Sequence, residues 1–293
     1  MLVFVTGGTG TIGSAVVAEL LAHHHTVLAL ARSDASAATL EGAGAEVLRG
    51  DLSDVDLLRR GADASEGVIS LAFGRDYGDP AAIARSITEE GVAVRALGER
   101  LVGSDRPLVV VSGTPWIPGR LSTEADPLPT GEGLGERTAT VEATLALAGR
   151  GVRSSAVRLP RTVHANGEGG FAGLLTDLAR RTGVSAYPGD GTRRWPAVHA
   201  ADAASLFRIA LESAPAGTAW HAVGDEGDAV RDLAAVIGRR LGLPVEPRPV
   251  EHFGPFGPIF AMDQPSSSAV TQEALGWGPT HPGQLEDLEL VQP

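Results

Sequence analysis

Eight residues near the start of the chain combine a repeated glycine spacing with a change from strand to helix. Thr6-Gly7-Gly8-Thr9-Gly10-Thr11-Ile12-Gly13 satisfies both G-x-x-G-x-x-G and G-x-G-x-x-G. An apolar segment, Leu2–Thr6, precedes the loop, and apolar residues at helical spacing follow it over Thr11–His23. Such glycines permit a tight turn, a close approach of backbone to a pyrophosphate, and close helix–strand packing. The sequence therefore predicts a dinucleotide site in which Thr6, Gly7, Gly8, Thr9, Gly10, Thr11, Ile12 and Gly13 contact the cofactor.

The residues after a second expected strand, Thr26–Ala31, bear on which dinucleotide is bound. An acidic side chain there binds the ribose 2′-hydroxyl of NAD, whereas an arginine accommodates the 2′-phosphate of NADP. Arg32 comes first, Ser33 adds a hydroxyl, and Asp34 is expected to cap the following helix. Because Arg32 precedes Asp34 after this strand, the sequence favours NADP(H), with NAD(H) as the alternative. The preference disappears if Arg32 is only a solvated surface charge.

Short apolar segments alternate with helical ones through the first half of the chain. Further strands are expected at Val68–Ala72, Leu108–Ser112 and Val152–Leu159, and helices at Asp54–Arg60, Pro80–Leu101 and Arg137–Arg150. The apolar pair Val47-Leu48 leads into Gly50-Asp51-Leu52. This alternation predicts an α/β fold with a Rossmann-type, doubly wound parallel sheet. We expect an NAD(P)-binding domain over residues 1–160, interleaved with a smaller C-terminal substrate-binding region over 161–293. Gly254–Pro258 is expected to be an irregular loop.

Composition excludes several classes of function. The 293 residues include 24 basic and 36 acidic side chains, for a net charge of −12, which disfavours nucleic acid as a partner. The absence of cysteine excludes disulfides and thiolate chemistry. No apolar run is long enough for a membrane span, and the start does not read as a signal peptide, so a cytoplasmic protein is expected. His23, His24 and His25 are expected to complement a helix dipole rather than bind metal.

Several motifs along the chain resemble those of extended short-chain dehydrogenase/reductases, the NAD(P)-dependent epimerase/dehydratase-like superfamily. Thr6–Gly13 resembles the TGxxGxxG loop of these proteins. The other matching segments are Asp51-Leu52, Leu71-Ala72, Val111–Thr114, Arg158–His164, Gly189–Trp195, Val198–Ala204 and Leu275–Pro279. The resemblance implies that Asp51 and Leu52 border the adenine pocket. It also implies that Leu71, Ala72 and Phe73 lie near the cofactor ribose, and that Ser112 and Pro160 lie beside the nicotinamide.

One departure from that family concerns its catalytic Tyr-x-x-x-Lys pair. The chain contains two tyrosines, Tyr77 and Tyr187, and neither has lysine four residues later; the chain contains no lysine at all. Counting back from Glu142 along the corresponding helix places Leu134 at the tyrosine position and Thr138 at the lysine position. The chain therefore resembles the atypical members, which keep the cofactor loop without the usual proton donor.

Other side chains on the matching segments could take part in the chemistry. Ser112 or Thr114 could bond a substrate oxygen, Tyr77 could replace the absent phenol, and His164 could donate a proton near neutral pH or be a buried, satisfied histidine. His199 could bind substrate or hold the architecture, and Asp202 is expected at a helix N-cap. The expected substrate-binding residues are Arg75, Trp116, Arg161, Arg194, Trp195 and His199. No metal site is expected.

These expectations support one main hypothesis and two alternatives. The main hypothesis is an NADP(H)-dependent oxidoreductase with a non-standard active site, acting on a small organic carbonyl, alcohol or imine. The alternatives are an epimerase- or isomerase-like enzyme that retains its cofactor, and a non-catalytic NAD(P)-binding sensor. The expected partner is a small-molecule substrate, and the expected assembly is a monomer or homodimer.

Overall fold

The computed structural model describes residues 1–74, 79–131 and 133–290, which form two compact units. Unit 1 consists of Met1–Ser112, Leu128–Arg158 and Ala204–Trp220. Unit 2 consists of Gly113–Pro127, Leu159–Ala203 and His221–Pro293. The two units alternate along the chain, so each is built from segments that are distant in sequence.

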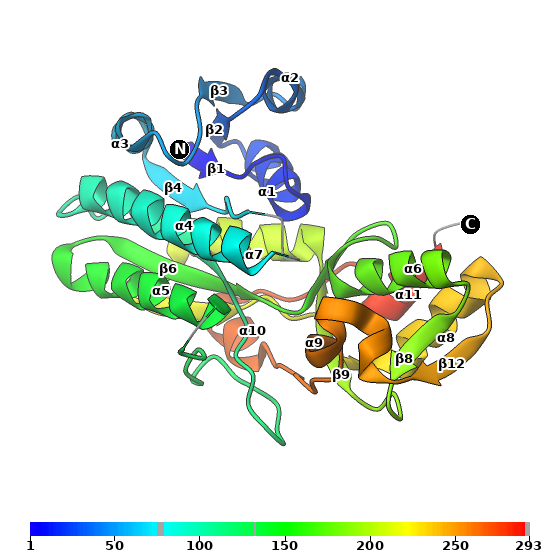
Figure 1. Ribbon diagram of the computed structural model, residues 1–293. Coiled ribbons are helices and arrows are strands. Elements are labelled where there is room, and N and C mark those ends of the chain that lie inside the picture. Colours follow the sequence, from blue (N-terminus) through cyan, green and yellow to red (C-terminus); the bar gives the residue numbers. More distant parts are fainter. Residues whose placement is uncertain (75–78, 132, 291–293) are drawn as a thin grey trace. The chain divides into compact units, whose positions relative to one another are not determined.

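Unit 1 is organised around a seven-stranded sheet with the order β10-β6-β5-β4-β1-β2-β3 (Figure 1). The strands are β1 Leu2–Thr6, β2 Thr26–Ala31, β3 Glu46–Arg49, β4 Gly67–Ser70, β5 Pro107–Gly113, β6 Arg153–Leu159 and β10 Thr218–His221. Every recorded pairing among β1 to β5 is parallel. Because the chain reverses its strand order at β1, the carboxyl ends of β1 and β4 form the switch point where such sheets bind ligands. The predicted Rossmann-type fold is confirmed.

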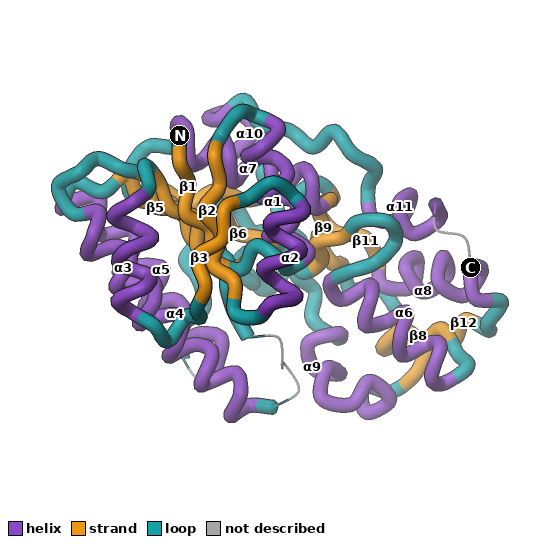
Figure 2. Tube along the Cα trace, turned by 90° about the horizontal axis from the view of Figure 1, so that it is seen from above, coloured by secondary structure: helices purple, strands orange, loops and turns teal. Residues whose placement is uncertain are grey.

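Helices cover both faces of this sheet, with α3, α4 and α5 on one face and α1, α2 and α7 on the other (Figure 2). Their bounds are α1 Thr11–Ala22, α2 Asp34–Gly42, α3 Val55–Ala64, α4 Pro80–Leu101, α5 Arg137–Leu145 and α7 Ala200–Ser213. The bounds predicted for α4 are confirmed. The helix expected over Arg137–Arg150 instead changes at Ala146 to a 3-10 helix that ends at Arg150, and the strand expected over Val68–Ala72 ends at Ser70.

The apolar strand residues explain why this sheet is central. Val3, Phe4, Val68 and Leu108 are fully buried, with helices on both faces of the sheet. Burial of such side chains contributes about 1.5–3 kcal/mol each relative to leaving them exposed. The resulting core holds the strand ends, where the candidate site residues lie, in fixed positions.

Unit 2 contains a three-stranded sheet, β11-β9-β7, and a two-stranded sheet, β12-β8. The strands are β7 Thr162–His164, β8 Ser185–Pro188, β9 Arg194–His199, β11 Asp225–Ala229 and β12 Val245–Arg248. The helices are α6 Gly170–Thr182, α8 Val230–Leu241, α9 Gly257–Phe260, α10 Ala269–Leu275 and α11 Gln284–Leu290. The buried aromatic side chains Trp195 and Phe260 pack together at 5.0 Å between ring centroids. They belong to a second hydrophobic core.

The expectation of an irregular loop over Gly254–Pro258 was wrong. A 3-10 helix over Val250–Phe256 breaks at Gly254, whose φ of 56° and ψ of −139° are not helical, and α9 begins at Gly257. Proline is tolerated in the first turn of a helix, because the amide it lacks would have no intrahelical partner there. The glycines and prolines therefore lie within two consecutive short helices and in the break at Gly254.

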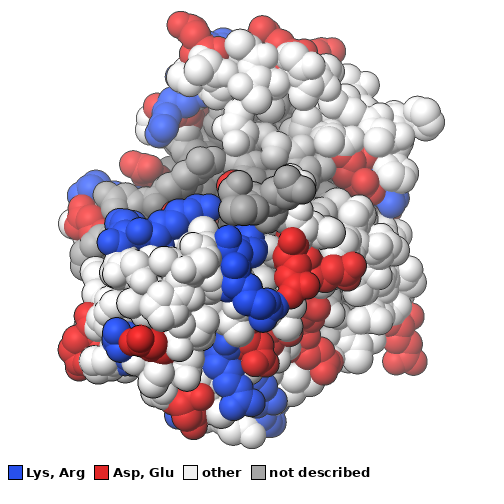
Figure 3. All heavy atoms as spheres, turned by 90° about the vertical axis from the view of Figure 1, so that its right-hand side faces the viewer, with Lys and Arg blue, Asp and Glu red and all other residues white. Residues whose placement is uncertain are grey.

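The surface carries both signs of charge despite the net charge of −12. On the face drawn in Figure 3, basic and acidic side chains lie beside one another. Exposed ion pairs such as Arg180–Asp177 and Arg239–Glu289 occur along the chain. Local basic positions that could hold a phosphate are thus compatible with the acidic total. None of the described helices is both long and apolar enough to cross a membrane.

Candidate functional site

The glycine loop lies between β1 and α1 in unit 1, and two of its glycines are required by packing. Gly7 has a φ of +77°, and a Cβ there would lie 2.7 Å from the amide nitrogen of Ala72. A Cβ on Gly13 would lie 2.0 Å from the carbonyl oxygen of Gly7. The loop therefore packs on the segment after β4 on one side and on its own helix on the other. This is a cradle that any larger side chain would fill.

Gly10 is the N-cap of α1 and differs from these two glycines. Its backbone is extended, with φ −76° and ψ 168°, which any residue can adopt. No side chain accepts a hydrogen bond from the backbone amides at the start of this helix. Thr9 and Thr11 beside it are exposed, and Ile12 is half-buried. The helix start can therefore donate hydrogen bonds to phosphate oxygens.

Thr6 ties the loop to the end of β4. Its buried Oγ1 accepts hydrogen bonds from the amides of Leu71 and Ala72, both at 3.3 Å, and lies 3.3 Å from Oγ of Ser70. The predicted cofactor residues at 6–13 and at 71–72 are thus brought together by direct bonds. Both segments lie at the carboxyl edge of the parallel sheet.

An exposed arginine, Arg32, directly follows β2. The Ser53 side chain and amide hold the pKa of the Asp51 carboxyl below its usual value, and the positive charge of Arg32 acts in the same direction. Arg32 and Asp51 are therefore close enough to interact electrostatically. Leu52 follows Asp51 and is half-buried. The predicted residues of the adenosine end come from two neighbouring strand ends.

The expectation that Asp34 caps α2 was wrong, because the helix begins one residue earlier than that role requires. Ser33 is the N-cap, and its Oγ accepts the amide of Ser36 at 3.2 Å. Asp34 instead pairs with Arg49 from β3, which also donates to the carbonyl of Ser33 at 2.8 Å. Arg49 carried no signal in the sequence, because this ion pair joins the first residue of α2 to the last residue of β3.

The region of the absent Tyr-x-x-x-Lys pair holds a different ion pair. Arg137 binds the buried carboxylate of Glu90 in bidentate fashion, and its guanidinium lies 4.2 Å from the ring centroid of Phe73. Thr138, at the position aligned with lysine, donates its hydroxyl proton to the carbonyl of Pro129. The arginine therefore contacts Phe73, which directly follows the Leu71-Ala72 segment predicted to lie near the cofactor. Sequence spacing gave no signal for this contact.

The other expected chemical residues of unit 1 are only partly described. Ser112 is buried near the carboxyl end of strand β5, next to Gly113. Arg75 and Tyr77 lie outside the described residues. The proposed roles of all three residues stay predictions.

Unit 2 brings three histidines together. His164 and His199 contact edge to face at 5.5 Å between ring centroids, and His199 stacks on His281 at 4.6 Å. Asp287 accepts a hydrogen bond from Nδ1 of His164 at 2.8 Å, and Asp202 accepts one from Nδ1 of His281 at 2.8 Å. Within this group the side-chain exposure rises from 2% for His164 to 45% for His281. His281 lies 82 residues beyond His199 and was not identified from the sequence.

The environment of these imidazoles affects their protonation. Burial lowers the pKa of His199, and the charges of His281 and His164 act in the same direction. Burial opposes ionisation of Asp202, yet bonds from His281 and from the 280–281 backbone hold its pKa below the usual value. Nε2 of His164 is buried without a hydrogen-bond partner. Carboxylate-oriented imidazoles of this kind can accept or release protons.

The N-cap expected at Asp202 is occupied by another residue. Asp202 lies inside α7, and its carboxylate accepts the amides of Thr280 and His281 at 3.0 and 3.1 Å. His199 directly precedes the helix, and its Nδ1 accepts the amide of Ala201 at 3.2 Å. The aspartate therefore anchors the 280–281 segment, while the imidazole caps the helix.

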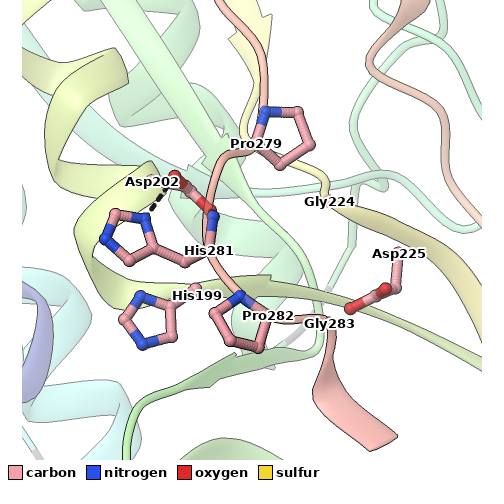
Figure 4. Close-up of a pocket in the computed structure, with 8 residues that line it drawn as sticks. All are labelled: His199, Asp202, Gly224, Asp225, Pro279, His281, Pro282 and Gly283. Carbon is pink, nitrogen blue, oxygen red and sulfur yellow. Dashed lines mark hydrogen bonds and ion pairs between the residues drawn. The ribbon is translucent and has the colours of Figure 1, made fainter. Parts of the chain in front are cut away.

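A pocket of about 100 Å³ opens beside the stacked rings. Figure 4 shows His199 and His281 on one side of it and Asp225 on the other. The lining residues are His199, Asp202, Gly224, Asp225, Pro279, His281, Pro282 and Gly283. A volume of that size admits a few waters or one small polar group. Among the described residues, no group of three or more His, Asp or Glu side chains is arranged to hold a metal ion.

The remaining predicted substrate residues of unit 2 form one connected set. Arg161 donates to Oε1 of Gln264 at 2.5 Å, and Nε2 of Gln264 donates to the carbonyl of Thr114 at 2.9 Å. Trp195 lies beside the Arg161 guanidinium, 5.7 Å from it to the ring centroid.

Asp263, the residue before Gln264, links two further predicted substrate residues. Trp116 donates its indole proton to the backbone carbonyl of Asp263 at 2.9 Å, and Arg194 forms an ion pair with the Asp263 carboxylate at 2.7 Å. Pro160 is buried directly after β6. The structure thus joins Thr114, Trp116, Arg161 and Arg194 through the 263–264 segment, which the sequence analysis had not identified.

Comparison with known proteins agrees with this architecture. The NAD dependent epimerase/dehydratase family model matches residues 3–223. An uncharacterized protein of Schizosaccharomyces pombe is 41% identical, with 98% of each chain covered. UDP-glucose 4-epimerase of Streptomyces lividans is 26% identical, with 98% of this chain and 93% of the relative covered.

Solved structures share the fold at lower identity. UDP-glucose 4-epimerase of Thermotoga maritima with UDP-glucose has a TM-score of 0.80 at 20% identity, covering 99% of this chain and 97% of that one. The Thermus thermophilus UDP-glucose 4-epimerase complex with NAD has a TM-score of 0.76 at 22% identity, with the same coverage. Together with the glycine cradle and the sheet order, the family match shows that the chain belongs to the NAD dependent epimerase/dehydratase family of extended short-chain dehydrogenase/reductases.

Proposed function

We propose that the protein is a nicotinamide-dependent oxidoreductase that prefers NADP(H) and acts on a small organic carbonyl, alcohol or imine. The observation that carries the proposal is the glycine cradle: Gly7 and Gly13 leave no room for a Cβ, and the start of α1 lacks a side-chain cap. The cofactor, when bound, supplies or accepts the hydride. Residues 6–13 would hold its pyrophosphate through backbone amides.

The preference for NADP(H) rests on Arg32. This arginine is exposed at the end of β2, and no ion pair to it is recorded among the described residues. A guanidinium in this position can bind a 2′-phosphate through two parallel hydrogen bonds. Arg49, which is paired with Asp34, is less available for that role.

The proton that accompanies hydride transfer requires a donor other than the absent tyrosine. Reduction of a carbonyl adds hydride to carbon and a proton to oxygen, so a side chain or a water must release that proton. Ser112 and Thr114 supply hydroxyls, and His164, held by Asp287, supplies an imidazole. We propose Ser112 and Thr114 as groups that orient the substrate oxygen and His164 as the proton source.

The experiment is a turnover screen with NADPH and NADH over a panel of aldehydes, ketones and imines, following the loss of cofactor absorbance. We expect turnover with NADPH, a decrease in kcat of about tenfold or more for Ser112→Ala, and a pH–rate profile that changes in His164→Gln. Arg59→Met is the control for a substitution elsewhere in the chain, at a half-buried residue whose guanidinium pairs with Asp56 at 3.0 Å. Tight cofactor binding without turnover on any substrate would contradict the oxidoreductase proposal and favour a sensor.

A second candidate is an epimerase-like reaction in which the cofactor is regenerated within each cycle. The relative from Streptomyces lividans is a UDP-glucose 4-epimerase, and the exposed Arg193 and Arg194 precede the buried Trp195 in β9. Product formation from a nucleotide sugar without net change in cofactor absorbance would distinguish this candidate from the first.

A further inference from the structure

Arg161 lies in unit 2, between Pro160 and the first residue of β7, and its guanidinium is largely removed from water. Burial lowers the pKa of Arg161 to about 10, although the negative charge of Asp263 acts in the opposite direction. A group that loses its hydration in this way is normally stabilised by a direct counterion. The partners of Arg161 therefore determine what the residue can do.

The hydrogen-bond partners of Arg161 are both neutral. Nη1 donates to the carbonyl of Ile259, and Nη2 donates to the amide oxygen of Gln264. Phe171 and Trp195 lie beside the guanidinium, at 5.3 and 5.7 Å from their ring centroids. Within residues 1–74, 79–131 and 133–290, no carboxylate forms an ion pair with Arg161. The cation is held in place by groups that leave its charge unneutralised.

The nearby carboxylate of Asp263 is already occupied. Arg194 donates to it from its backbone amide at 2.7 Å, from Nε at 3.1 Å and from Nη2 at 2.7 Å. Those bonds hold the pKa of Asp263 below its usual value. Asp263 therefore acts on Arg161 only through space, because its hydrogen-bonding oxygens face another arginine.

Further hydrogen-bond donors on the same connected set are buried without partners. These are Nε of Arg161 itself, Nε1 of Trp195 and Oγ1 of Thr114. Trp195 is 0% exposed and Thr114 is 6% exposed. A buried donor without an acceptor destabilises the folded state, because it has lost its hydrogen bonds to water. An indole N–H and an arginine N–H can only donate, so each of them requires an acceptor.

We propose that Arg161 is the receptor for an oxyanion, a carboxylate or phosphoryl group, that the substrate carries, with Phe171 and Trp195 as the apolar walls beside it. The assignment of that anion to the substrate rests on the proposed function, whereas the binding of an oxyanion by Arg161 does not. A planar guanidinium held by fixed neutral acceptors is preorganised for such a group. The substrate class thus narrows to carbonyl or alcohol compounds that bear a negative charge.

The test measures oxyanion binding without turnover, by thermal unfolding of the full chain. The probes are acetate, succinate and inorganic phosphate, each compared with chloride at equal ionic strength and with neutral acetamide. We expect a rise in Tm of roughly 5 °C when an oxyanion is in about 100-fold excess over its Kd, and none with acetamide. A response to acetate and succinate alone identifies a carboxylate, and a response to phosphate alone identifies a phosphoryl group.

Two variants assign the response to Arg161. Arg161→Met keeps an unbranched side chain without the charge and should abolish the oxyanion shift; Arg248→Met, whose partner Glu246 lies at 2.6 Å, should keep it. Arg161→Lys retains charge but loses the fork, so we expect about tenfold weaker binding. This variant decides the matter if Arg161→Met does not fold.

An oxyanion shift that is equal in the wild type, Arg161→Met and Arg161→Lys would overturn the proposal, as would the absence of any shift in the wild type. A parallel NADPH titration separates this failure from that of the proposed function. If the oxyanion shift is absent but NADPH still binds, the result contradicts only the proposal that Arg161 binds an oxyanion. If NADPH does not bind but the oxyanion shift is present, the result contradicts only the proposed oxidoreductase function.

Discussion

Gly13 packs against Gly7 so closely that a Cβ on Gly13 would lie 2.0 Å from the Gly7 carbonyl oxygen. Gly7 of the same loop also packs closely against the backbone of Ala72. The start of α1, the loop and the end of β4 therefore form one packed group. This group positions the backbone amides to which we assign the pyrophosphate, and the packing alone requires glycine at both positions.

The first prediction follows from that packing. Gly13→Ala must displace backbone atoms, so we expect it to lower the free energy of unfolding by about 3 kcal/mol, measured by urea denaturation. Gly42→Ala is the matched control in the same unit, because nothing lies within 4 Å of the added Cβ. A Gly13→Ala protein as stable as Gly42→Ala would contradict the packing described here.

The second prediction concerns the choice of dinucleotide. Arg32→Met removes the charge proposed to bind the 2′-phosphate, so we expect the Kd for NADPH to rise about tenfold or more while that for NADH changes little. Fluorescence titration measures both constants, with Arg59→Met as the control. An equal change for the two dinucleotides would remove Arg32 from the selection of NADP(H).

Local patterns predicted the parts of the fold that local forces determine. The glycine loop, β1, β2 and the bounds of α4 follow from spacing, apolar runs and a proline at the start of a helix. Contacts between distant segments had no such signal. The bond between Arg137 and Glu90 joins residues 47 apart, and the bond between His281 and Asp202 joins residues 79 apart. Asp34 failed as a cap because Ser33, one position earlier, makes that bond.

The third prediction concerns Asp228 in β11. Burial, together with the charges of Asp225 and Asp232, raises the pKa of Asp228 to about 6. A raised carboxyl pKa means that the folded state binds more protons than the unfolded one, so this group's contribution to stability falls as pH rises through about 6. Asp228→Asn should therefore stabilise the protein at pH 8 by about 1 kcal/mol, after allowance for partial exposure.

The pH dependence of that effect is its own control. At pH 4 the carboxyl of Asp228 is protonated in the folded wild type, so the advantage of Asp228→Asn should vanish. Urea denaturation at pH 4, 6 and 8 gives the comparison. A stabilisation that is constant across this range would show that packing, and not ionisation, is responsible.

The fourth prediction concerns the stack of histidines. Because the pKa of His199 is lowered in the folded state, the unfolded chain binds more protons as pH falls below ~6.5, and stability is lost on acidification. His199→Asn keeps an oxygen that can accept the amide of Ala201 and removes the titrating ring. We expect this variant to lose less stability between pH 7.5 and 5.5 than the wild type. Equal losses would contradict the role assigned to His199.

The most direct test of the account is a titration of the wild type and of Gly10→Asp with NADPH, in which isothermal titration calorimetry measures the Kd. Gly10 has an extended backbone that any residue can adopt, so Gly10→Asp should fold with an unchanged circular dichroism spectrum. Its carboxylate at the start of α1 should repel the pyrophosphate and weaken binding about a hundredfold. Tight NADPH binding by the wild type and its loss in Gly10→Asp is the predicted result. Equal affinities in the two proteins, or no binding by the wild type, would contradict the assignment of a cofactor to this loop.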